Sequence, residues 1–145
     1  MTHNNEKTSA FLTHIASFGG FFFPLGSILT PLILWQTFKN RSPFLDKQGK
    51  EAVNFNISYG LYMILASLMT TLFFMVKFLN PFKNMELFLF DFNGDLALKG
   101  LLNLIGISFL VGVIGLIKIV LIISAAIKAN KGEEYTYPFT IRFIK

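Results

Sequence analysis

One lysine, Lys118, interrupts an otherwise uncharged run from Gly100 to Ile127. It stands ten residues before Lys128, which at about 1.5 Å per residue is roughly 15 Å, half of a hydrocarbon core about 30 Å thick. An ammonium group at that depth needs a polar partner or water. We favour a snorkelling or helix-packing role, and the alternative is ion conduction or proton transfer.

A second polar set consists of Asn54, Ser58 and Tyr62, with Glu51 one turn earlier. The spacing of three or four residues places all four side chains on one face of a helix. Such an edge should face protein or water rather than lipid tails. It predicts hydrogen bonds to neighbouring segments, or, as the alternative, one wall of a polar path.

His14, one turn before Ser17, is the remaining titratable group in an apolar segment. It has no second histidine, cysteine or carboxylate on its own helix, so a packing histidine is favoured over a metal ligand or a general base. Phosphate-cradling loops, nucleophile elbows and helical His-Glu pairs are missing from the sequence. We therefore predict no catalytic residue, no metal site, no cofactor and no enzymatic activity.

Small residues recur at spacings of three and four late in the chain, which aligns them on one helix face. Such a stripe lets two helices approach closely in lipid, so it predicts a packing surface. Its small members are Ser108, Gly112, Gly115 and Ala126, and Ile119 and Ile122 lie on the same face.

Three apolar blocks must position these side chains, at 10–38, 52–79 and 100–129. Each is long enough for a membrane span of about 20 residues, which predicts an all-α integral membrane protein with three to four transmembrane helices. The first block contains Gly19, Gly20 and Pro24, so it should be broken there. It is either one kinked crossing or a re-entrant hairpin.

The polar segments between the blocks set the orientation. Basic residues are concentrated in the loop 39–51 and in the tail 130–145, so both should be cytoplasmic at the inner membrane. The aromatic loop 80–99 should then be extracytoplasmic, and 1–9 is a polar tail. We expect a short strand or an amphipathic segment at the end of the chain. The net charge of +5 is scattered, which argues against nucleic acid.

Three motifs carry a family resemblance: HIASFGGFFFPLGSILTPLILW, SPFLDKQGKEAVNFNIS and AAIKANKGEEYTYPFTIRFIK. In this order they resemble a bacterial family of small multi-pass membrane proteins of unknown function. That family is distantly grouped with the twenty-kilodalton Tic subunit of the chloroplast inner-envelope import translocon. The resemblance implies a shared scaffold and, by analogy, a translocon-like role.

Together these features predict a non-catalytic scaffold or subunit of a membrane complex. Its partners would be membrane lipids and either further copies of itself or other membrane proteins. The alternative is a transport or translocon-like channel component, with Lys118, His14 and the Asn54 edge lining a polar path.

Overall fold

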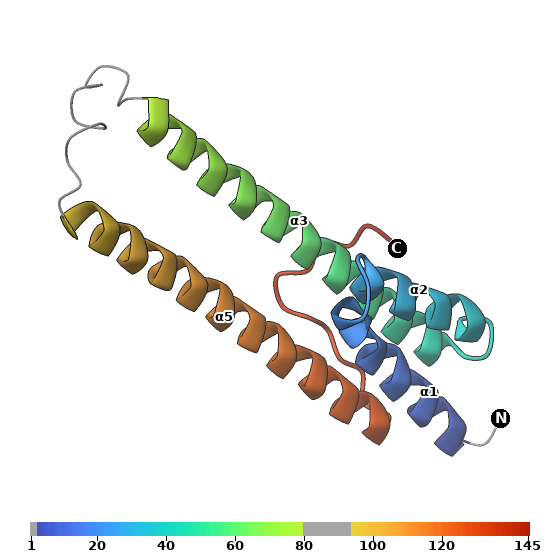
Figure 1. The fold of residues 1–145 in the computed structure, drawn as a ribbon. Coiled ribbons are helices and arrows are strands. Elements are labelled where there is room, and N and C mark those ends of the chain that lie inside the picture. Colours follow the sequence, from blue (N-terminus) through green and yellow to red (C-terminus); the bar gives the residue numbers. More distant parts are fainter. Residues whose placement is uncertain (1–2, 80–93) are drawn as a thin grey trace. The chain divides into compact units, whose positions relative to one another are not determined.

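The computed structural model describes residues 3–79 and 94–145 (Figure 1). These residues form four α-helices and one short 3₁₀ helix, with no strand among them. The chain divides into two compact units, one formed by 1–62 with 118–145 and the other by 63–117. The units are described separately below.

The first unit begins with a helical hairpin. Helix α1 (His3–Ile15) continues into the 3₁₀ helix η1 (Ala16–Phe21), and α2 (Gly26–Phe38) packs back against both. The reversal falls where glycines and a proline were expected to break the first block, and it places Leu25 in the left-handed region at φ 63°. With 13 residues each, α1 and α2 are shorter than the roughly 20 residues that a span needs.

Close backbone contact holds the hairpin together. A Cβ atom added to Gly26 would overlap the backbone of Gly19, so both glycines are needed for the approach of η1 to α2. The Thr30 hydroxyl donates to the carbonyl oxygens of Ala16 and Gly26, which joins the two limbs.

Helix α3 runs from Pro43 to Leu79. Proline suits the first turn of a helix, and the Ser42 hydroxyl accepts a hydrogen bond from the Leu45 N–H at 3.3 Å. The expected loop 39–51 is therefore wrong for residues 43–51, which are helical because this start signal precedes the apolar block. Within α3, residues Pro43–Leu72 are a candidate membrane span.

Helix α5 runs from Gly94 to Lys131, and Ser108–Lys131 is the second candidate span. It ends at Gly132, whose φ of 84° allows the Glu133 N–H to bond back to Lys128. Residues 94–99, expected in the aromatic loop, are helical. Residues 80–93 of that loop lie outside the described part of the chain.

The core of the first unit joins three helices and the C-terminal segment. Ala10 of α1, Leu45 of α3 and Ala129 of α5 form one buried cluster, in which the alanines allow close helix approach. A second cluster contains Phe55, Ile122, Ala125 and Tyr137. After α5 the C-terminal segment has no regular structure, so the strand considered for it is not formed.

The second unit contains the remaining parts of α3 and α5. Its described side chains are mainly apolar and exposed, such as Met69 at 70% and Phe109 at 71%. Many exposed apolar side chains on one pair of helices are typical of a membrane or protein contact. Two long apolar helices thus fit a membrane protein by length and composition.

Candidate functional site

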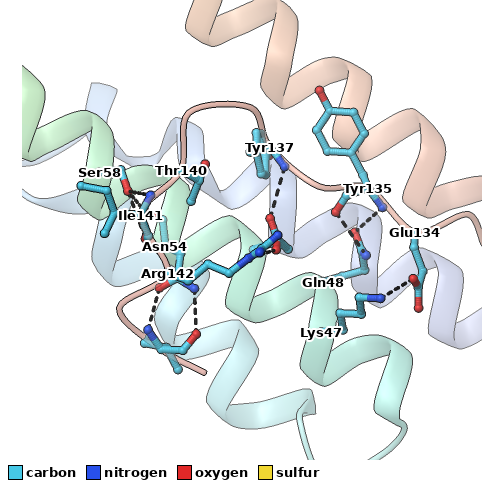
Figure 2. Close-up of polar contacts among 12 residues, drawn as sticks. Lys47, Gln48, Asn54, Ser58, Glu134, Tyr135, Tyr137, Thr140, Ile141 and Arg142 are labelled. Atoms are coloured by element: carbon cyan, nitrogen blue, oxygen red, sulfur yellow. Dashed lines mark hydrogen bonds and ion pairs between the residues drawn. The ribbon is translucent and has the colours of Figure 1, made fainter.

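A row of polar side chains on α3 holds the C-terminal segment (Figure 2). Its members are spaced three or four residues apart, so they share one helix face. Each bonds to the backbone of residues 135–144, and we call this arrangement the clasp. The α3 members of the clasp are Gln48, Glu51, Asn54, Ser58 and Tyr62.

The outgoing limb of the segment binds the first two members of the row. Gln48 donates through Nε2 to the Tyr135 carbonyl at 3.5 Å and accepts from the Tyr135 N–H at 3.4 Å. Glu51 accepts the Tyr137 N–H at 3.2 Å. The segment therefore runs along α3 in register with successive helical turns.

The segment then reverses at Phe139, which has a left-handed φ of 57°. The Tyr62 hydroxyl donates to the Phe139 carbonyl at 2.9 Å. On the return limb, Ser58 Oγ accepts the Ile141 N–H at 2.9 Å, and Asn54 binds both the N–H and the carbonyl of Ile144 at 2.9 Å. One face of α3 thus holds both limbs and the turn between them.

Two ion pairs reinforce the clasp. Arg142 Nε lies 3.4 Å from Glu51 Oε1, and Lys47 pairs with Glu134. Arg142, Lys47 and Glu134 are largely exposed, so each pair contributes little by itself. The buried Glu51 carboxylate is the exception, because it combines an ion pair with a backbone hydrogen bond.

His14 reaches the clasp from α1 and is fully buried. Its Nε2 lies 3.0 Å from Gln48 Oε1, and its Nδ1 lies 3.0 Å from the Tyr137 hydroxyl. Because Gln48 Oε1 also accepts the Tyr135 N–H, it is an acceptor, so Nε2 carries the proton and Nδ1 accepts from Tyr137. Burial lowers the pKa of His14 to about 4, and the hydrogen bond to Gln48 offsets a smaller part of that drop. The ring is a neutral bridge.

Tyr137 is the aromatic centre of the clasp. Its ring stacks on Phe55 with centroids 4.0 Å apart, and Tyr135 meets it edge-on at 5.0 Å. Burial raises its pKa well above the ordinary value, and the nearby Tyr135 and Glu51 add to that rise. The phenol is thus a hydrogen-bond donor to His14.

A second buried contact joins the hairpin to α3. Asn56 donates through Nδ2 to Ser17 Oγ at 2.7 Å and to the Ala52 carbonyl at 2.9 Å. Its Oδ1 has no hydrogen-bond partner in the described part of the chain. Ser17 therefore binds α3 at Asn56, whereas His14 binds α3 at Gln48 and also binds Tyr137.

Lys118 lies against another aromatic ring. Its Nζ stands 4.3 Å from the centroid of Tyr59 on α3, a cation–π contact. Among residues 3–79 and 94–145, no hydrogen bond connects Lys118 to His14 or Asn54. The structure brings His14 into contact with the row on α3 through Gln48 but does not link Lys118 to either.

The small-residue stripe divides between the two units. Ile122 and Ala126 are buried in the first unit. Ser108 and Gly112 are exposed in the second unit, and a Cβ added to Gly112 or Gly115 meets no described atom within 4 Å. In the described part of the chain, only the later portion of the stripe is packed.

Gln48, Asn56 and Tyr137 were missed in the sequence. Gln48 continues the Glu51–Asn54 spacing one turn earlier, a signal that the loop assignment concealed. Tyr137 carries no local signal, because its partners lie more than 80 residues away.

The clasp holds its polar groups in hydrogen bonds with each other and with the backbone. Over residues 3–79 and 94–145, no group of three or more histidine, cysteine, aspartate or glutamate side chains could hold a metal ion. The geometry is that of a structural clamp between α1, α3 and the C-terminal segment.

Comparison with known proteins identifies a family that the chain matches. No curated protein and no solved structure matches the chain. Residues 5–144 match the model of the magnetosome magnetite crystal formation protein family. The match agrees with the expected small membrane protein family, and nothing in it supports the grouping with the Tic subunit. Since it covers nearly the whole chain, the protein belongs to the magnetosome magnetite crystal formation protein family.

Proposed function

We propose that this chain is a non-catalytic, multi-pass membrane protein that acts as a structural subunit of a complex in magnetite crystal formation. The clasp is the observation that supports a structural role. His14, Gln48, Glu51 and Tyr137 are the reactive or polar groups that an active site would use, and all four are engaged in fixing the C-terminal segment.

The proposed topology has α3 and α5 as the crossing helices. The connection 39–42 and the C-terminal segment then lie on one side of the membrane, which the positive-inside rule assigns to the cytoplasm. The hairpin of α1, η1 and α2 enters one leaflet without crossing. Its short helices support this, as does its apolar tip, where Phe21 is 76% and Phe22 is 86% exposed.

The clasp suits a subunit that presents a fixed surface to partners. It leaves Phe139 at 90% and Phe143 at 50% exposed, while the backbones of Phe139 and of Ile144, which follows Phe143, are bonded to α3. A segment fixed in advance loses less conformational entropy when a partner binds. Further copies of this chain and other membrane proteins are the partners we expect.

Complementation tests this proposal. The chain is expressed in a magnetite-forming host that lacks its own family member, and crystal size and number are measured by electron microscopy. We expect the wild-type chain to restore crystals and Asn54→Ala with Ser58→Ala to restore fewer at equal membrane abundance. Equal restoration by the clasp variant would contradict a role for the clasp. Failure of the wild-type chain would contradict the role in crystal formation.

Transport is the second candidate, because Lys118 lies within a candidate span. Its contact with Tyr59 favours packing, since the ring already supplies a partner for the ammonium group. We therefore expect that Lys118→Met does not abolish any solute or ion flux measured with purified protein in liposomes. A flux that this variant removes would favour the transport role instead.

A further inference from the structure

The surroundings of α3 change at Tyr62. Between 52 and 60 every residue of the helix is buried or half-buried. Between 61 and 72 every residue except Met63 is exposed, including the large apolar side chain of Met69 at 70%. Protein therefore covers α3 before Tyr62, and the apolar surface after it needs another apolar environment.

Helix α5 changes at the matching place. Residues 108–117 are exposed, apart from Gly115, and the buried residues of its described part begin at Ile122. Lys118 lies between these two regions, with its Nζ 4.3 Å from the centroid of the Tyr59 ring on α3. The change on α5 is therefore level with the change on α3 to within about one helical turn.

The C-terminal segment contains backbone that lipid tails cannot solvate. It has no regular structure, and the clasp bonds its backbone only at intervals. In the described part of the chain, Thr136 and Thr140 receive no backbone hydrogen bond from α3. The remaining polar groups need water, because irregular backbone facing lipid leaves them unsatisfied. Tyr62 is the clasp member farthest along α3, so this backbone extends to the level of Tyr62.

The first limb of the hairpin points toward the same level. Along α1 and η1 the contacts advance along α3, from Gln48 at His14 to Asn56 at Ser17. Both contacts lie before Tyr62, and η1 continues beyond Ser17 in the same direction. The turn of the hairpin is therefore its part nearest to Tyr62.

The turn of the hairpin, residues 22–25, is apolar and exposed. Phe22 is 86% and Leu25 is 69% exposed. Just after the turn, Ile28 Cδ1 lies 3.9 Å from the position of a Cβ added to Gly60. The turn therefore presents its side chains at the point where the covered part of α3 ends.

The C-terminal segment places one more exposed ring at this level. Phe139 is 90% exposed, and Tyr62 binds its carbonyl oxygen. Phe143 precedes Ile144, which is bonded to Asn54, eight residues or about 12 Å before Tyr62 along the helix. Only Phe139 therefore stands level with the hairpin turn.

We propose that the hydrocarbon of the bilayer begins at the level of Tyr62, and that Phe22, Leu25 and Phe139 form an apolar collar that enters the cytoplasmic leaflet. The clasp and the hairpin helices then lie in water, and only the hairpin turn enters lipid. Lipid is the partner of the collar because α3 continues without a break from Tyr62 into its exposed apolar surface. The inference rests on the proposed topology, in which α3 and α5 cross the membrane.

The charges of α5 support this boundary. Lys99 and Lys118 enclose the uncharged stretch 100–117, 18 residues in all. This stretch is about 27 Å of helix, close to a hydrocarbon core of about 30 Å. Lys118 then stands at the headgroups, where its ammonium group meets lipid phosphate as well as Tyr59. The distance from Lys128 had suggested a position in the middle of the bilayer.

Spin labelling of the full-length chain in lipid nanodiscs tests the boundary. The chain has no cysteine, so a single exposed substitution carries one label. Collisions with oxygen, which concentrates in lipid, are compared with collisions with a water-soluble nickel chelate. We expect oxygen to dominate at Met69→Cys and the chelate to dominate at Ile33→Cys and Thr136→Cys. Phe22→Cys and Phe139→Cys should give intermediate ratios of the two.

Ile33 is the discriminating position. Its apolar side chain is 61% exposed, and it follows Ile28 along α2 in the direction away from the hairpin turn. If the hydrocarbon began at Pro43, where the candidate span begins by composition, Ile33→Cys would collide mainly with oxygen. That result, or collisions at both Phe22→Cys and Phe139→Cys as dominated by the chelate as those at Thr136→Cys, would overturn the proposal.

Sidedness separates this inference from the topology on which it rests. If Asn40→Cys and Asn84→Cys react with an impermeant reagent from one side, the proposed crossing of α3 fails. If they react from opposite sides and the depth pattern is absent, only the collar fails. Emission of the single tryptophan, Trp35, identifies labelled variants that keep the native fold. Leu25→Cys serves as the hairpin position if Phe22→Cys loses that emission.

Discussion

The Asn54 carboxamide pairs with both backbone polar groups of Ile144, at 2.9 Å for each hydrogen bond. A residue in the middle of a helix thereby gives an extended segment the two bonds that a neighbouring strand would give. Asn54 is itself buried, so in the folded protein its carboxamide depends on the Ile144 backbone for its partners.

Asn54→Ala should therefore loosen the end of the chain. Losing both bonds leaves the Ile144 N–H and carbonyl unpaired, which should lower the free energy of unfolding by about 1–3 kcal/mol. Hydrogen exchange of the Ile144 amide should accelerate, and proteolysis after Arg142 should become faster. Asn130→Ala, at an exposed position near the end of α5, is the control and should change neither.

Gly49→Ala should destabilise the packing of α2 against α3. An added Cβ would overlap the Trp35 ring, which is fixed by its hydrogen bond to Asp46, and we expect a loss of about 1–3 kcal/mol. Trp35 is the single tryptophan, so its fluorescence reports the change directly.

Gly60→Ala is the comparison for this variant. The nearest atom to its added Cβ is Ile28 Cδ1 at 3.9 Å, an ordinary contact. The substitution should be neutral or stabilising by up to about 1 kcal/mol, because alanine favours a helix over glycine. Similar losses at both glycines would contradict the contact between Trp35 and Gly49.

Acid should destabilise the first unit through His14. Its pKa is about 4 in the folded protein, against 6.5 for an unperturbed histidine, so the unfolded chain binds the proton more readily. The stabilising contribution is present above pH 6.5 and is lost as the pH falls toward 4. The loss is about 3 kcal/mol, converted from the change in pKa.

Unfolding in detergent, followed by Trp35 fluorescence from about pH 8 to about pH 4, checks this slope. His14→Leu has no titrating ring, so its unfolding free energy should vary less over this range although it starts lower. The lower start follows because Gln48 and Tyr137 lose a partner. Parallel pH profiles for the two proteins would show that His14 is not the titrating group.

The sequence patterns predicted the positions of the helices better than they predicted the contacts between them. Long uncharged runs revealed the helices, and Gly19, Gly20 and Pro24 marked the break in the first block, because these signals are local. The spacing of Glu51, Asn54, Ser58 and Tyr62 predicted one bonded face. It did not identify the C-terminal segment as the partner, since that contact joins residues about 80 apart and uses backbone atoms that no side-chain pattern encodes.

Helix boundaries were the weaker part. The charged residues Asp46, Lys47 and Lys50 suggested a loop, yet they lie in α3, where their side chains bond to each other, to Trp35 and to Glu134. Charge in a sequence indicates contact with water or with an opposite charge, and both are compatible with a helix.

Cysteine labelling should place the N-terminus and the α2–α3 connection on the same side of the membrane. The chain has no cysteine, so single substitutions at exposed Asn5, Asn40 and Asn130 can be labelled without background. Because α1 and α2 are too short to span and fold back on each other, all three should react with an impermeant reagent from the cytoplasmic side. Asn84→Cys, between the two spans, should react only from the opposite side. If Asn5→Cys reacted from the same side as Asn84→Cys, the first block would instead cross the membrane once.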